Sequence, residues 1–225
     1  LAGAARESKH LESDLGDLSA WLRAGEILAQ KRVCADYERS AFEKALLDIR
    51  GLTRENPAAI WPRVEQLCAA AGVAVVLVPE LPKTHIYGFT RWLTPRKALI
   101  QLSLRYKTDD MLWFTFFHEA AHILLHGKKD VFLECRDCDG VKEDEANRWA
   151  SEFLVPDKRW QSFIAAKDPP VPEREIRAFA DEQGIAPSIV LGRLQHRAKL
   201  VGPGQYNHLK RHLDIVWQGL DPVAP

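Results

Sequence analysis

Residues 108–127 of the 225-residue chain read TDDMLWFTFFHEAAHILLHG, and this stretch predicts a long helix at the centre of the molecule. The hydroxyl of Thr108 and the carboxylates of Asp109 and Asp110 can cap free backbone N–H groups and complement the helix dipole. Gly127 is expected to end the helix. Between these limits apolar side chains lie on almost every side, which is typical of a helix buried on all its faces.

The histidines of this helix, His118 and His122, are four residues apart and therefore lie on the same face, one turn apart. Two neutral imidazoles in this arrangement can bind one tetrahedral zinc ion. Glu119 lies beside them and can take a proton from a metal-bound water, whose pKa zinc lowers to about 7. The alternative is a pair of hydrogen-bonded core histidines, but His-Glu-x-x-His arises by chance in such a chain about once in a hundred cases. The capped apolar helix around the motif favours the metal site.

A catalytic zinc site needs a third protein ligand and leaves the fourth position to water, and two acidic residues downstream are candidates. Glu143 shares a helix face with Ala146, Asn147 and Ala150, at spacings of three and four. The two small alanines let that face approach the first helix closely, and the asparagine can hydrogen-bond a ligand. Glu145 points about 160° away from Glu143, so only one of the two can face the metal. Glu143 is therefore favoured as the ligand, and Glu145 stays the alternative.

The order of the elements predicts an α+β protein, with N-terminal helices, a small sheet, the central helix and further helices. Three short β-branched and apolar runs predict strands, at residues 73–78, 86–92 and 98–104. Helical spacing predicts helices within residues 11–50, from near Pro62 to before Gly72, and at 143–154. Residues 128–142 are expected to form a polar loop.

We expect three regions along the chain, an N-terminal helical region at 1–56, a metallopeptidase domain at 57–168 and a C-terminal helical unit at 169–225. Within the last region, residues 173–199 predict two helices joined by a glycine-containing turn, which is the pattern of a helix-turn-helix. The second of these helices is basic, with Arg193, His196, Arg197 and Lys199. Such a unit can contact DNA or form a packing hairpin, and the zero net charge of the chain favours the hairpin.

The composition excludes several classes of protein. Lys plus Arg and Asp plus Glu both number 31, whereas a strongly basic nucleic-acid binder needs an excess of positive charge. No apolar run approaches the roughly 20 residues that span a bilayer, and no secretory signal opens the chain, so we expect a cytoplasmic protein with no membrane partner. The four cysteines are too sparse for a disulfide scaffold, and Cys135 and Cys138 are expected to be an incidental loop pair.

Two segments carry a resemblance to a known family: FTFFHEAAHILLHG at 114–127, and EDEANRWA at 143–150 followed by LVP at 154–156. Together they resemble the ImmA/IrrE family of metallopeptidases, over about residues 60–160.

The resemblance implies a zincin-like domain with a gluzincin-like site. In that site His118 and His122 bind zinc, Glu119 is the general base, and a downstream glutamate completes the ligand set. Trp149 stands where the family usually has phenylalanine.

The wider chain, including WLRAGE at 21–26 and LSLRYKTDD at 102–110, is similar to versions fused behind a Cro/repressor-type helix-turn-helix domain. The chain starts at Leu1 without a methionine, so we expect such a domain upstream, with DNA contact through it. These versions are often associated with toxin–antitoxin operons, and members of the family are known for cutting repressors.

The predicted function is that of a zinc-dependent endopeptidase that hydrolyses a peptide bond in a transcriptional repressor or an antitoxin-type regulator. The strand at 98–104 is expected to bind the extended substrate by strand addition. The alternative is a zinc-stabilised regulatory module that pairs with a repressor or with DNA without cleaving. The presence of Glu119 argues against this alternative, because a purely structural zinc site needs no base.

Overall fold

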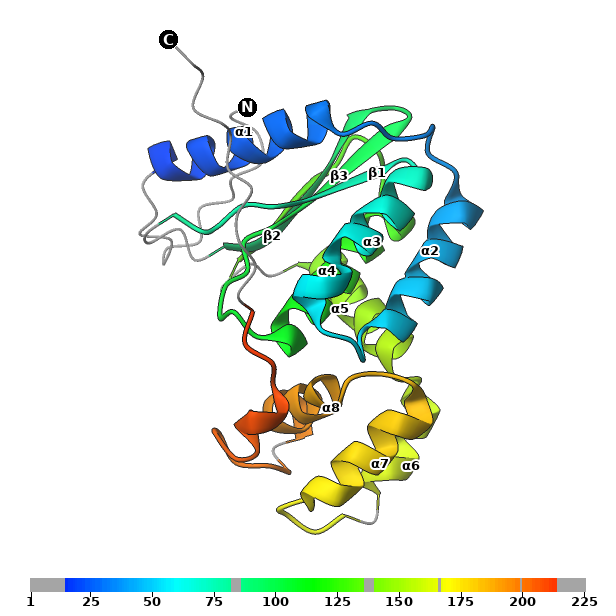
Figure 1. Ribbon diagram of the computed structural model, residues 1–225, viewed down its shortest axis with the longest axis vertical. Helices are drawn as coiled ribbons and strands as arrows, with labels where there is room; N and C mark the ends of the chain where they lie inside the picture. Colours follow the sequence, from blue (N-terminus) through cyan, green and yellow to red (C-terminus); the bar gives the residue numbers. More distant parts are fainter. Residues whose placement is uncertain (1–14, 82–85, 136–139, 166, 199, 214–225) are drawn as a thin grey trace.

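The computed structural model describes residues 15–81, 86–135, 140–165, 167–198 and 200–213 (Figure 1). These residues form a small four-stranded mixed sheet with helices on both faces, so the predicted α+β class is confirmed. Helix α1 (Leu15–Lys31) covers one face, and α3 (Pro57–Ala70) and α4 (Asp109–Leu125) pack on the other. Among the described helices, none has both the length and the apolar character needed to cross a bilayer.

The sheet consists of β1 (Val73–Leu77), β2 (Ile86–Thr94), β3 (Lys97–Leu102) and β4 (Val131–Cys135), in the order β1-β3-β2-β4. β3 runs parallel to β1 and antiparallel to β2, which also pairs antiparallel with β4. The prediction that substrate adds to the strand at 98–104 is therefore wrong, because β3 is hydrogen-bonded on both sides. The edges of the sheet are β1 and β4.

Strand β4 lies inside residues 128–142, which the sequence predicts as a loop. The prediction is wrong because the apolar run from Val131 to Leu133 is too short to be distinguished from a loop by its pattern alone. Its strand conformation comes from pairing with β2, where Phe89 lies opposite Leu133 and Thr90 opposite Phe132.

Two helices precede the sheet on the side of α4, namely α2 (Arg39–Leu52) and α3 (Pro57–Ala70). The sequence predicts that the second of these begins near Pro62, and this is wrong. The side chain of Asn56 accepts a hydrogen bond from the backbone N–H of Ala58 at 3.0 Å, so Asn56 is the N-cap and Pro57 is the first helical residue.

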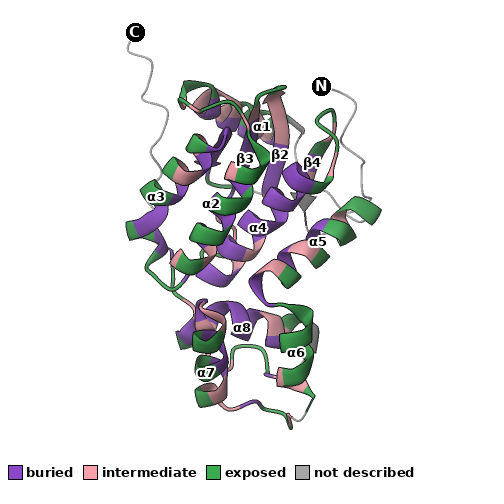
Figure 2. Cartoon of the chain, turned by 90° about the vertical axis from the view of Figure 1, so that its right-hand side faces the viewer, coloured by how far each residue is buried: buried purple, intermediate pink, exposed green. Residues whose placement is uncertain are grey.

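The long segment at the centre of the sequence forms α4 (Asp109–Leu125), which is buried along most of its length (Figure 2). Trp113, Phe116 and Phe117 have no exposed surface and belong to the main hydrophobic core. Helix α5 (Val141–Leu154) packs against α4 through Ala146 and Ala150, which are also fully buried. The close approach expected from these small side chains is present.

The C-terminal helices are α6 (Asp157–Ile164), α7 (Glu173–Gln183) and α8 (Pro187–Arg193), and a π-helical turn (Leu194–Ala198) and a 3-10 turn (Asn207–Leu209) follow. Gly184 ends α7 with φ +68°, a conformation that glycine adopts without strain.

Helix α8 packs against the first turn of α4. A Cβ atom at Gly192 would lie 2.9 Å from Oδ2 of Asp110, so the glycine permits this approach. Lys210 forms an ion pair with the same Asp110 carboxylate at 2.7 Å. Through these contacts with Asp110, the C-terminal segment packs against the first turn of the helix that carries the histidines.

The ion pair between Lys210 and Asp110 should contribute to stability, because the two side chains are only 13% and 4% exposed. We expect Lys210→Met to lower the free energy of unfolding by about 1–3 kcal/mol, because it leaves a buried carboxylate without its partner. Urea denaturation measures the loss. Lys129→Met, at an exposed position, is the matched control, and adding Asp110→Asn to the first variant should restore part of the stability. An unchanged urea midpoint for Lys210→Met would show that the pair is not stabilising.

Candidate metal centre

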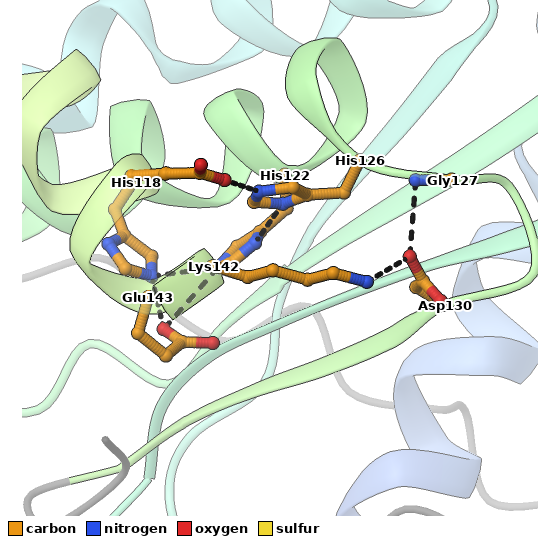
Figure 3. A network of polar contacts seen from close by, with 8 residues as sticks. His118, His122, His126, Gly127, Asp130, Lys142 and Glu143 are labelled. Atoms are coloured by element: carbon orange, nitrogen blue, oxygen red, sulfur yellow. Dashed lines mark hydrogen bonds and ion pairs between the residues drawn. The ribbon is translucent and has the colours of Figure 1, made fainter. Parts of the chain in front are cut away.

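The imidazoles of His118 and His122 project from α4 toward α5, and each residue is 1% exposed. Their Nε2 atoms are 3.0 Å apart. Oε2 of Glu143, in the first turn of α5, lies 3.0 Å from Nε2 of His118 and 3.5 Å from Nε2 of His122. Figure 3 shows the three side chains pointing toward one another. The structure thus brings together the two histidines and the acidic residue that the sequence favours as ligands.

The three ligand atoms lie within 4.8 Å of one another, and in the described part of the chain no other group of three His, Cys, Asp or Glu residues comes together in this way. Each of these atoms can offer a lone pair to a cation, and a cation placed among them would be attracted to all three. Two imidazole nitrogens and one carboxylate oxygen form a donor set that suits Zn²⁺ and leaves a fourth position open. The residues present therefore fit a zinc ion.

A second contact orients the ring of His118. Its Nδ1 atom lies 3.1 Å from Oδ1 of Asn147, one turn after Glu143 on α5. If Nδ1–H donates to this oxygen, Nε2 keeps its lone pair for a metal. The contact between Asn147 and a histidine is the one that the sequence predicts.

Phe132 in β4 supports the ring of His122. The two rings are stacked, with centroids 4.0 Å apart and an interplanar angle of 15°. Sequence reasoning missed Phe132, because its segment is predicted as a loop. The signal that could have located it is the single aromatic residue in the short apolar run between Asp130 and Glu134.

Glu145 does not reach the group formed by His118, His122 and Glu143. Its Oε2 atom instead lies 3.1 Å from Nε2 of His126, whose Nδ1 atom is 2.9 Å from Nδ1 of His122. The sequence leaves Glu145 open as the third ligand, but the structure places the carboxylate of Glu143 at the two Nε2 atoms.

Glu119 is fully buried between α4 and β2. A Cβ atom at Gly88 of β2 would lie 2.2 Å from Oε1 of Glu119, so only glycine leaves space for this carboxylate. Thr90 of β2 donates a hydrogen bond to the backbone oxygen of Glu119 at 3.3 Å. Sequence reasoning identified Glu119 but missed Gly88, because nothing in the sequence indicates which glycine faces the helix.

The environment favours the protonation states that bind a metal. Burial lowers the pKa of His122 from 6.5 to about 4, so its imidazole is neutral at pH 7. Burial raises the pKa of Glu143, but the neighbouring imidazoles of His118 and His122 outweigh burial and lower that pKa to about 2. Glu143 is therefore ionised at neutral pH.

The predicted Cys-x-x-Cys pair falls partly outside the described residues. Cys135 ends β4, and Cys138 belongs to the segment 136–139 that the structure does not describe.

The lowered pKa of His122 predicts how the stability of the metal-free chain depends on pH. Between about pH 4 and 6.5 the unfolded chain binds more protons than the folded chain. The contribution of neutral His122 to the free energy of unfolding is therefore fully present above pH 6.5 and is lost as the pH falls toward 4. The total loss should be on the order of 2–3 kcal/mol. Urea denaturation of chelator-treated protein at pH 7, 6 and 5 measures it. His122→Asn should flatten the dependence and His208→Asn, at an exposed position, should not. Equal slopes for the parent and His122→Asn would contradict the assignment.

Comparison with known proteins places this arrangement in a family. The family described as IrrE N-terminal-like domain, a peptidase family, matches residues 68–181 of the chain. This match includes the segments that carry His118, Glu119, His122 and Glu143. No curated protein matches the chain. The chain therefore belongs to the ImmA/IrrE family, whose members are metallopeptidases.

Proposed function

We propose that this protein is a zinc-dependent endopeptidase in which His118, His122 and Glu143 hold the metal and Glu119 is the general base. The observation that carries the proposal is the convergence of two Nε2 atoms and one carboxylate oxygen between α4 and α5. Membership of a metallopeptidase family supports the same reaction class. The surrounding fold, with a small sheet beside a buried helix that carries the histidines, agrees with the zincin-like domain that the family resemblance implies.

When bound, zinc supplies a Lewis acid and lowers the pKa of a water molecule. Glu119 accepts a proton from the attacking water and returns it to the leaving amide nitrogen. Asn147 and Phe132 hold the two imidazole rings in place, so that the ligands need not reorganise during the reaction.

An edge strand near the histidines offers a place for an extended substrate. Within the described residues β4 pairs only with β2, so its other side can accept a peptide by strand addition. Phe132 of β4 stacks on His122, so a peptide paired with β4 passes beside the metal ligands. In this proposal β4, and not the strand predicted at residues 98–104, binds the extended substrate by strand addition.

For the substrate we propose a transcriptional repressor or an antitoxin-type regulator, present in the same polypeptide or encoded nearby. The support is family resemblance, together with the need for a peptidase inside a cell to accept few sequences. A second recognition surface, such as the basic helix around Arg193 and Arg197, would select the partner.

Arg193 itself does not serve this purpose. Its guanidinium donates hydrogen bonds to the backbone oxygens of Ser151 and Val155 and to the carboxylate of Asp157, at 2.9–3.1 Å. It also lies over the ring of Trp160, 4.3 Å from the centroid. Arg193 therefore joins α8 to α5 and α6, and a contact with DNA or a repressor would have to come from other residues.

Zinc binding tests the ligand set. Metal-free chain reloaded with zinc should hold about one equivalent, and the double variant His118→Ala, His122→Ala should hold none. Glu143→Ala should weaken binding far more than Glu145→Ala, because only the first removes a ligand atom. Elemental analysis and competition with a chromogenic chelator measure both effects. A larger loss for Glu145→Ala would transfer the third ligand to that residue.

Catalysis is tested separately with Glu119→Gln, which occupies the same space but cannot take up a proton. This variant should keep one equivalent of zinc and lose at least about a hundredfold in the rate of peptide hydrolysis. The substrate is the cognate repressor, with casein as the unspecific control, and cleavage is followed by mass spectrometry. Digestion of casein with the repressor intact would refute the substrate proposal. Tight binding of an uncut repressor by the parent chain would favour the non-catalytic regulatory module.

A further inference from the structure

We propose that Glu145 and His126 are positioning residues that fix the tautomer of His122, so that its Nε2 lone pair faces the metal. This inference rests on the proposed zinc site and extends it to two residues outside the ligand set. The three side chains form a continuous series from the surface to the site, and Figure 3 shows the rings of His126 and His122 in it. The side chain of Glu145 is 49% exposed, that of His126 is 3% exposed, and that of His122 is fully buried.

The carboxylate of Glu145 sets the direction of the first hydrogen bond in this series, and the ring of His126 passes that direction on to His122. An ionised carboxylate can only accept, so Nε2–H of His126 donates to Oε2 of Glu145 across 3.1 Å. When the ring of His126 carries a single N–H group, this group is the one bonded to Glu145, and Nδ1 of His126 is then the acceptor. The donor across the 2.9 Å contact is then Nδ1–H of His122. His122 is left with an unprotonated Nε2 atom, which is the form that binds zinc.

The position of His126 explains how Glu145 takes part although it points away from Glu143 on α5. His126 is the C-cap of α4, with φ −113° and ψ 169°, so its backbone has already left the helix. A histidine at the C-terminal end of a helix can bond the free carbonyl groups there or face the neighbouring cleft. The backbone N–H of His126 donates to the oxygen of His122, while the ring of His126 reaches Glu145.

Phe132 keeps the two imidazoles of this series in place. Its ring stacks on His122, and its centroid is 5.0 Å from that of His126, at an interplanar angle of 36°. Both imidazoles therefore contact one apolar surface, and rotation of either would lose that contact. Phe132 therefore restricts the orientation of both imidazole rings.

Helix α5 thus supports both histidine ligands from outside while it supplies Glu143 between them. Asn147 reaches His118 directly, and Glu145 reaches His122 through His126. Partners of this kind typically change metal affinity by about 10–100-fold when they are removed.

Zinc affinity of the full chain, measured by chelator competition, is the first test. His126→Leu should weaken binding about 10–100-fold, because Nδ1–H of His122 loses its acceptor. His126→Asn should restore most of the affinity, since its Oδ1 atom can occupy the position of Nδ1. Glu145→Gln should retain it, because an amide oxygen accepts the same bond. Asp144→Asn, which removes a neighbouring exposed charge from α5, is the matched control and should stay within about twofold.

The second test observes the tautomer without metal. In ¹⁵N-labelled, metal-free chain, long-range ¹H–¹⁵N spectra should show His122 protonated on Nδ1, and Glu145→Ala should add the form protonated on Nε2. Glu145 is exposed, so this variant is expected to fold even if His126→Leu does not. A parent chain with His122 protonated on Nε2 would overturn the inference, as would unchanged affinity in His126→Leu. A parent chain that shows the expected tautomer but binds no zinc would instead contradict the proposed function.

Discussion

Two alanines without exposed surface, Ala146 and Ala150, allow α5 to lie directly against α4. This contact determines the site, because α5 carries Glu143 and Asn147, which contact the ring of His118 at 3.0 Å and 3.1 Å. Side chains longer than a methyl group at the alanine positions would separate the helices and move both residues away together. The position of a ligand atom on a second helix depends on the packing between the two helices as much as on the rotamer of its own side chain.

The remaining elements hold α4 so that this contact can form. Trp113, Phe116 and Phe117 anchor the helix in the core, and β2 covers the side that carries Glu119. Polar groups in an apolar helix are costly to bury unless each has a partner. The histidines meet this condition through residues that approach from α5 and β4, so the apolar core and the polar site depend on the same packing.

Much of this arrangement could be predicted from local sequence patterns. The parts that could not be predicted are those that depend on contacts between residues distant in sequence. The helix around His118 and His122 follows from its apolar residues, and the preference for Glu143 follows from the 100° rotation per residue in a helix. Strand β4 could not be predicted, because five residues acquire strand structure only by pairing with β2. The space for Glu119 at Gly88 and the internal contacts of Arg193 are likewise tertiary.

The helix-face argument agrees with where the structure places the carboxylate of Glu143, but it overlooks the residues that contact the histidines from outside this face. It considers Glu145 only as an alternative ligand, because it assumes that a group acting on the site must lie on the face of α5 turned toward α4. Because α4 ends at His126, the backbone there is free to turn the ring outward, to the side of α5 where Glu145 lies. A helix terminus thus lets a residue that points away from a site still act on it. Acidic and polar residues on either side of a metal ligand therefore need to be considered together with the side chains at the end of the neighbouring helix.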